Sequence, residues 1–187
     1  GDITINSGTV EAYGSAGGAG IGGAYQTGSG TATGNVTING GRVIAVGGQN
    51  GASCGAGIGS GENADFNGTV TISGGVVYVQ AGNSDAASIG GGGQAIGTSG
   101  NGTFIADGNA VIVNPGRIGD RSHVDEWSGI FIYQNGNEAI GAVDQNTASL
   151  SGDTITLNNA HARVFGEVTL DYDLVVDSSS TLEIFQG

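Results

Sequence analysis

The feature that most constrains this chain is a repeat of 33 or 34 residues. The segment "DITINSGTVEAYG" at 2–14 aligns without a gap with "NVTINGGRVIAVG" at 35–47, and "TVTISGGVVYVQAG" at 69–82 and "GTFIADGNAVIVN" at 102–114 follow at the same spacing. Small-residue stretches that end in Ala-x-Ile-Gly come after the first three units, at 18–22, 55–59 and 86–90. Because a short repeat can bury its apolar face only against its neighbours, this period predicts a stack of similar units.

Alternation of apolar and polar residues inside each unit predicts three short strands separated by glycine turns. We expect the inward side chains to be, strand by strand, Ile3, Ile5, Val36, Ile38, Val70, Ile72, Phe104 and Ala106, then Val10, Ala12, Val43, Ala45, Val77, Val79, Val111 and Val113, then Ala19, Ile21, Ala56, Ile58, Ala87 and Ile89. The pattern predicts an all-β chain folded as a parallel β-helix with three short strands per coil. Right-handed winding is expected, because parallel crossovers strongly prefer that hand.

The stretch "GAGIG", which occurs at 18–22 and again at 55–59, is predicted to be a corner of this helix. Coils stack about 4.8 Å apart, so Ile21, Ile58 and Ile89 should lie above one another. One isoleucine and one alanine fill a narrow corner, and the flanking glycines allow the chain to bend there.

We predict a single domain over 1–187, with regular coils in 1–114, a long loop at 115–127 and irregular coils in 128–187. The later segment "DTITLNNAHARVFGEVTLDYDLVVDSSSTLEIF" at 153–185 alternates at a shorter spacing, which predicts shorter coils. The chain starts in the middle of a unit without a methionine and ends without a polar cap, so we expect it to be a piece of a larger protein.

The amino-acid composition excludes several classes of fold and several kinds of binding partner. The chain has 40 glycines without a three-residue period, which excludes collagen, and its regular Val/Ile pairs exclude a disordered tract. A formal net charge of −13 makes nucleic acid and anionic membranes poor partners, and no apolar run is long enough to span a membrane. The only cysteine, Cys54, is expected to be a small buried side chain.

The outward side of the second strand carries apolar residues where the first strand carries threonine and asparagine. These outward residues are Tyr13, Ile44, Val46, Val76, Tyr78 and Ile112. Stacked on adjacent coils, they would form a large apolar patch. Either a glycine-rich loop covers this patch, or it binds sugar rings or a partner protein, with Tyr13, Ile44 and Tyr78 as contacts.

The longest loop holds the only tryptophan, Trp127, directly after Asp125 and Glu126. An aromatic ring beside carboxylates can stack on a sugar and accept hydrogen bonds from its hydroxyl groups. The alternative is that Trp127 closes one end of the core as a lid.

The sequence predicts no cofactor and no catalytic centre. The segments "ENADFNG" at 62–68 and "GDRSHVDE" at 119–126 offer oxygen ligands for a loop Ca²⁺, but neither has EF-hand spacing. The acids Asp2, Glu11 and Asp107 do not share a column, whereas β-helical glycosidases place acids on neighbouring coils. A non-enzyme is therefore expected, and a fragment of a polysaccharide-active β-helical enzyme, a lyase or glycosidase, is the alternative.

The combination of "VTINGGRVIAVGG", "GAGIGSG" and "GEVTLDYDLVVDSSSTLEI" resembles repeat-bearing β-helical surface proteins of gut-type bacteria. The element "DITINSGTVEA" is also similar to β-helical carbohydrate-binding domains from clostridia. These resemblances imply an extracellular or cell-surface protein with an adhesive role. Its implied partner is a polysaccharide or surface glycan.

Overall fold

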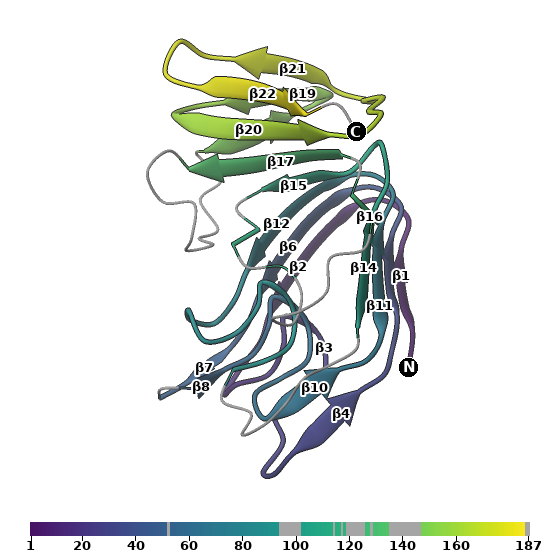
Figure 1. Cartoon of the computed structure of the whole chain (residues 1–187), viewed down its shortest axis with the longest axis vertical. Helices are drawn as coiled ribbons and strands as arrows, with labels where there is room; N and C mark the ends of the chain where they lie inside the picture. The colour runs from purple at the N-terminus through teal and green to yellow at the C-terminus, as the bar shows by residue number, and fades with distance from the viewer. Residues whose placement is uncertain are drawn as a thin grey trace.

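The structure is a computed structural model that describes residues 1–51, 53–93, 102–113, 115–116, 118, 126–127, 129–134 and 147–185. Every regular element in these residues is a β-strand, and most strands pair in parallel with the equivalent strand of the next coil (Figure 1).

The coils are built from three stacked sets of parallel strands. The first set is β1 (Ile3–Ile5), β5 (Val36–Ile38), β11 (Thr69–Ile72), β14 (Thr103–Ala106) and β16 (Glu126–Trp127). The second begins with β2 (Thr9–Tyr13), β6 (Arg42–Val46), β12 (Val76–Gln80), β15 (Val111–Val113) and β17 (Gly129–Gln134). The third is β3 (Ile21–Gly22), β9 (Ile58–Gly59) and β13 (Ile89–Gly90). The predicted parallel β-helix with three strands per coil is confirmed, while the hand of its winding stays a prediction.

Two shorter strand pairs lie in the loops between these three sets. Strand β4 (Gly30–Ala32) pairs in parallel with β10 (Ala64–Phe66), and β7 (Gln49–Asn50) forms a hairpin with β8 (Ser53–Cys54). Cys54 is fully buried beside Ala81 and Ala86, as predicted.

The interior column of isoleucines is confirmed. Ile58 lies in register with Ile21 on one side and with Ile89 on the other, and all three side chains are buried. The glycine after each isoleucine has a positive φ, 132° at Gly22 and 139° at Gly59, which other residues rarely adopt. A Cβ at Gly59 would also collide with the carbonyl oxygen of the glycine stacked above it. Backbone shape and close stacking thus both require glycine in this corner.

In the fourth unit, the first strand faces inward as predicted, with Phe104 and Ala106 in the core, but the predicted faces of the second strand are wrong. Val77 pairs with Ile112, so Ile112 faces the interior, and Val111 and Val113 face outward. Three residues separate β11 from β12, whereas the four residues 107–110 separate β14 from β15. One extra residue in a corner moves every following side chain to the opposite face of the strand.

The C-terminal residues form five strands, and the chain reverses direction before them. They hold β18 (Ala148–Ser151), β19 (Thr154–Leu157), β20 (Ala160–Phe165), β21 (Asp173–Val176) and β22 (Thr181–Phe185). Strand β20 runs antiparallel to β17, and β22 then pairs with β20, so the second set grows into a seven-stranded sheet (Figure 1). Strands β18, β19 and β21 form a separate sheet.

This separate sheet packs on the outer face of the seven-stranded sheet and creates a second core. Its buried members are Ile44, Val76, Tyr78, Val111, Val113, Ile130, Ile132, Ala148, Ile155, Leu157, Ala160 and Ala162. The seven-stranded sheet therefore has an apolar core on each side, the solenoid core within the coils and the second core outside them.

Candidate functional site

The predicted apolar patch is not an open surface. Ile44 is 0% exposed and Tyr78 is 1% exposed, because the C-terminal strands cover them. The Tyr78 hydroxyl donates a hydrogen bond of 2.6 Å to the carbonyl oxygen of Ala148 in β18, and the Arg42 guanidinium lies 5.3 Å from the centre of the Tyr78 ring. Neither a sugar nor a partner protein can reach Ile44 or Tyr78, and their cover is a folded sheet instead of the glycine-rich loop that the sequence suggested.

The other predicted contacts are scattered or lie outside the described residues. Tyr13 is 64% exposed on the first coil, in register with Val46, so the C-terminal strands do not cover it. Glu126 and Trp127 pair with Ile105 and Ala106 through β16, and their side chains are outside the described part. Asp125 is outside it altogether, so a ligand-binding role for this loop stays a prediction.

A line of hydrogen-bonded polar side chains follows the first corner of the coils. We name it the polar ladder: Asn6, Asn39, Ser73 and Asp107, the residues directly after β1, β5, β11 and β14. The Asn39 Nδ2 group donates to Asn6 Oδ1 at 2.8 Å, and the Ser73 hydroxyl donates to Asn39 Oδ1 at 2.9 Å. The ladder places hydrogen-bonding groups at the spacing of the coils.

The polar ladder ends in a cavity of about 320 Å³, which we name the corner pocket. Its lining residues are Ser73, Asp107, Gly108, Asn109, Glu167 and Thr169. The extra residue in the corner before β15 creates this shape, because residues 107–110 form a turn in which the amide of Ala110 donates to the carbonyl of Asp107. The C-terminal segment before β21 supplies the opposite wall.

The corner pocket presents acceptors to whatever enters it. Asp107 Oδ1 accepts a bond of 2.7 Å from the amide of Gly108, which leaves its second oxygen available. The side-chain oxygen of Asn109 is buried and accepts no hydrogen bond. Glu167 adds a second carboxylate, and no arginine of the described residues lines the cavity. Carboxylate oxygens accept strong hydrogen bonds, so a ligand with hydroxyl donors suits this cavity.

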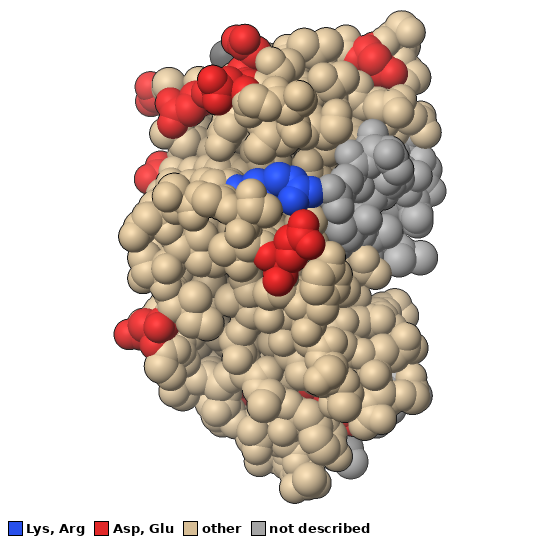
Figure 2. Space-filling model, turned by 180° about the vertical axis from the view of Figure 1, so that it is seen from behind, with Lys and Arg blue, Asp and Glu red and all other residues tan. Residues whose placement is uncertain are grey.

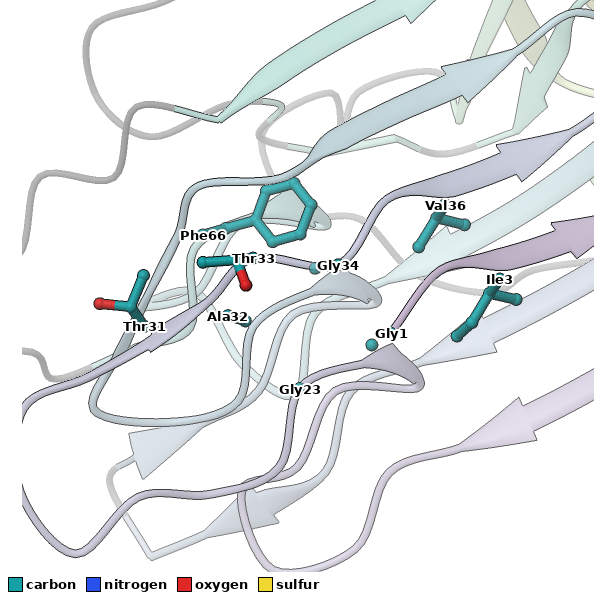
Figure 3. A pocket seen from close by; sticks show the side chains of 11 residues that line it. Gly1, Ile3, Gly23, Thr31, Ala32, Thr33, Gly34, Val36 and Phe66 are labelled. Carbon is teal, nitrogen blue, oxygen red and sulfur yellow. The ribbon is translucent and has the colours of Figure 1, made fainter.

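A second cavity, of about 260 Å³, opens at the first coil (Figure 3). Ile3, Val36 and Phe66 give it apolar walls, and Thr31 and Thr33 add hydroxyl groups. Figure 3 shows Phe66 beside Thr33, with Ile3 and Val36 on neighbouring strands. The Phe66 ring is almost fully buried in the solenoid core. This cavity carries fewer polar side chains than the corner pocket.

Neither predicted calcium segment forms a complete ion shell among the described residues. Glu62 is 6% exposed, and its Oε2 and the Oδ1 of Asp65 are buried without a hydrogen-bond partner. Ca²⁺ takes six to eight oxygens, and the described residues hold no group of three or more metal-binding side chains. The segment at 119–126 falls outside the described part except for the backbone of its last residue. A loop calcium stays a prediction.

Sequence reasoning missed Glu167 and Asn109. Glu167 is 60 residues from Asp107 in a region without the main repeat, so no spacing rule could bring the two together. The signal for Asn109 was present, because "ADGNAV" is one residue longer than the equivalent "ISGGV". That insertion marks a corner with a different shape.

The face shown in Figure 2 carries carboxylates in several separate groups and only one group of basic side chains. Among the described residues, Arg42 forms an ion pair of 3.4 Å with Glu11, and Arg163 lies 3.8 Å from Glu183. These arginines are therefore engaged with acids of the same chain.

No helix within the described ranges is long and apolar enough to cross a membrane.

Comparison with known proteins agrees with the geometry. The sequence model of the β-helix repeat family matches residues 3–25, 36–62 and 70–93, which are the first three coils. No curated protein and no solved structure matches the chain. The fold and these three matches define a β-helical repeat protein.

Proposed function

We propose that this protein is a non-catalytic, glycan-binding segment of an exported bacterial surface protein. The ligand would be a polysaccharide or surface glycan that lies along the polar ladder and enters the corner pocket. The observation that carries the proposal is the corner pocket itself, in which Asp107 and Glu167, from segments far apart in the chain, line one cavity with Ser73, Asn109 and Thr169.

Sugar hydroxyl groups can donate hydrogen bonds to the two carboxylates of the corner pocket. Carboxylates accept strong hydrogen bonds from hydroxyl groups, and Asp107 and Glu167 face the cavity from opposite segments of the chain. The ladder adds Asn6, Asn39 and Ser73 at the coil spacing, so a chain of sugars would meet similar groups repeatedly. Pre-formed coils would hold these groups in place before the ligand binds.

The acidic surface and the resemblance to bacterial surface proteins support an extracellular location and an adhesive role. A rigid solenoid with an acidic exterior remains soluble and does not attract nucleic acid. Its long side can present one binding face repeatedly, which suits attachment to a polymer.

The experiment is a titration of the full chain against plant and mucin polysaccharides, with binding measured by calorimetry or affinity electrophoresis. We expect Asp107→Asn and Glu167→Gln, which keep the size and remove the charge, each to weaken binding by roughly tenfold, since hydrogen bonds to charged groups are worth about 1.5–3 kcal/mol. Glu11→Gln, a charge change on another strand, is the matched control and should bind normally. Equal affinity of all three variants, or no binding to any polymer, would remove the proposal.

A polysaccharide-active enzyme is the second candidate, and the pair of carboxylates in one cavity favours it. Asp107 and Glu167 could serve as acid and base on a glycosidic bond. The enzyme would be established if the wild type released shortened sugar chains and both Asp107→Asn and Glu167→Gln did not. Binding without turnover would leave the non-catalytic function.

A further inference from the structure

No described arginine lines the corner pocket beside its two acids, and the chain contains no lysine. Asp107 and Glu167 both line the cavity, and both side chains are exposed. The backbone of Glu167 lies against the turn that holds Asp107, because a Cβ added at Gly108 would be 2.8 Å from the Glu167 carbonyl oxygen. Both described arginines form ion pairs elsewhere, with Glu11 and Glu183. The cavity therefore carries negative charge that the described residues do not neutralise.

The segment that carries Glu167 continues this negative charge away from the pocket. Alternate residues of the segment pack against the second core, and they are Val168, Leu170, Tyr172 and Leu174. The residues between them are exposed, and they are Glu167, Thr169, Asp171 and Asp173. Burial raises the pKa of Tyr172, and the nearby negative charges of Asp171 and Asp153 raise it further. We name Glu167, Asp171 and Asp173 the acidic row, which leads outward from the pocket.

This arrangement disfavours an acidic glycan. A uronic acid or a sialic acid in the cavity would place its carboxylate beside two like charges, and an ionised carboxylate can only accept hydrogen bonds. A protonated amine has three donors and no acceptor, so it matches the two carboxylates in hydrogen bonding. It also adds an attraction between opposite charges that a neutral hydroxyl group lacks.

The walls of the cavity fit a sugar better than the side chain of lysine. Besides the two acids and Gly108, the described lining residues are Ser73, Asn109 and Thr169, and none of them has a large apolar side chain. The ammonium group of lysine stands on a flexible four-carbon stem, which would find no apolar wall there. On an amino sugar, hydroxyl groups flank the amine, and Ser73, Asn109 and Thr169 offer them hydrogen-bonding partners.

We infer that the corner pocket selects an amino sugar with a free, protonated amine, within a polysaccharide that is at least partly deacetylated. This inference rests on the glycan-binding function proposed above and adds the charge of the ligand to it. The ammonium group lies between Asp107 and Glu167, and further amino sugars of the same polymer follow the acidic row. A net charge of −13 attracts such a polycation from a distance, and the pocket supplies the specific contact.

The test measures binding of three hexasaccharides to the full chain by calorimetry at about pH 5.5, where aspartate and glutamate are ionised. They are the hexamer of glucosamine with free amines, the same hexamer with acetylated amines, and a hexamer of galacturonic acid. We expect the glucosamine hexamer to bind roughly tenfold more tightly than the acetylated one, from two exposed ion pairs. Added salt should reduce this preference, because it screens exposed charges. The galacturonic acid hexamer should not bind.

Three variants separate the pocket from the overall charge of the chain. Asp107→Asn and Glu167→Gln should each reduce the preference for the free amine about threefold, since each removes one of the two ion pairs. Glu11→Gln changes the net charge by the same amount on another strand, and it should leave the preference unchanged.

Equal binding of the free and acetylated hexamers, or an equal loss of preference in Glu11→Gln, would overturn this inference while glycan binding itself would stand. If neither the hexamers nor the plant and mucin polysaccharides bound, the proposed function would fail and this inference with it. A pentalysine peptide that bound as tightly as the glucosamine hexamer, with the same loss in Asp107→Asn, would also overturn the inference, because a basic peptide would then be the ligand.

Discussion

The solenoid core within the coils and the second core, which strands β18 and β19 complete from outside, lie on opposite faces of the same seven-stranded sheet. The solenoid core is built from identical positions of successive coils, such as Ile21, Ile58 and Ile89, and each contact repeats the one below. The second core joins stacked residues of the coils, such as Ile44 and Tyr78, to strands β18 and β19, which lie outside the repeat.

This difference shows how one apolar strand pattern can serve two purposes. In β12, Val77 and Val79 belong to the solenoid core, while Val76 and Tyr78 belong to the second core. A strand with apolar residues on both faces is buried on both. The first strand set has threonine on its outer face, so that face remains open to solvent and carries the polar ladder at its end.

The largest expected effect comes from breaking the repeated core. Ile58→Asp would place an unpaired charge between two buried isoleucines, and we expect the free energy of unfolding to fall by on the order of 5 kcal/mol. Urea unfolding followed by circular dichroism measures this. Ile184→Asp, at an exposed site of the last strand, is the control and should cost less than about 1 kcal/mol. Similar losses for both variants would contradict the stacked interior.

We expect the second core to be destabilised without loss of stability in the solenoid core. Leu157→Ala removes a fully buried side chain from β19, and we expect a loss of about 3 kcal/mol. Hydrogen exchange should accelerate in residues 148–176, whereas the amides of β5, β6 and β11 should keep their protection. Equal acceleration in both regions would mean that the two cores form one cooperative unit.

Glycine should matter more in the repeated corner than in the C-terminal turn. A Cβ at Gly59 would strain the backbone and collide with the coil above. Gly152 also has a positive φ, 58°, but a Cβ there would meet open space. We expect a loss of about 3 kcal/mol for the first and about 1 kcal/mol for the second, measured as midpoints of urea unfolding. Equal losses would show that backbone conformation alone decides both positions.

The smallest expected effect concerns the hydroxyl that joins the two regions. Tyr78→Phe removes the bond to Ala148, at a cost of about 1 kcal/mol near neutral pH. Burial raises the pKa of Tyr78 above its ordinary value, with Arg42 opposing the shift. The stability linked to this group is complete below the unfolded pKa, near 10, and is lost as the pH rises through the folded pKa. The free energy of unfolding, measured from pH 8 to pH 11, should therefore fall less steeply in Tyr78→Phe than in the wild type. An unchanged slope would contradict this prediction.

The period of the sequence was sufficient to predict the coils, the three strand sets and the isoleucine column, because stacking repeats the same local pattern. It failed at the fourth unit, where one inserted residue before β15 exchanged the faces of Val111 and Ile112. It could not show that residues 148–157 cover Tyr78, since a contact between a repeated and a non-repeated segment has no period. For the same reason, Asp107 was recognised as an outward acid, but its neighbour Glu167 was not.

The most direct measurement is a nuclear Overhauser spectrum of the isotope-labelled protein, read at two adjacent residues of β12. The back-to-back arrangement predicts contacts from the Tyr78 ring to the methyl group of Ala148, and from the Val77 methyl groups to Ile112 but not to Ala148. A Tyr78 ring that contacts no residue of β18 or β19, or a Val77 that shares its contacts, would contradict the two-sided sheet on which the rest depends.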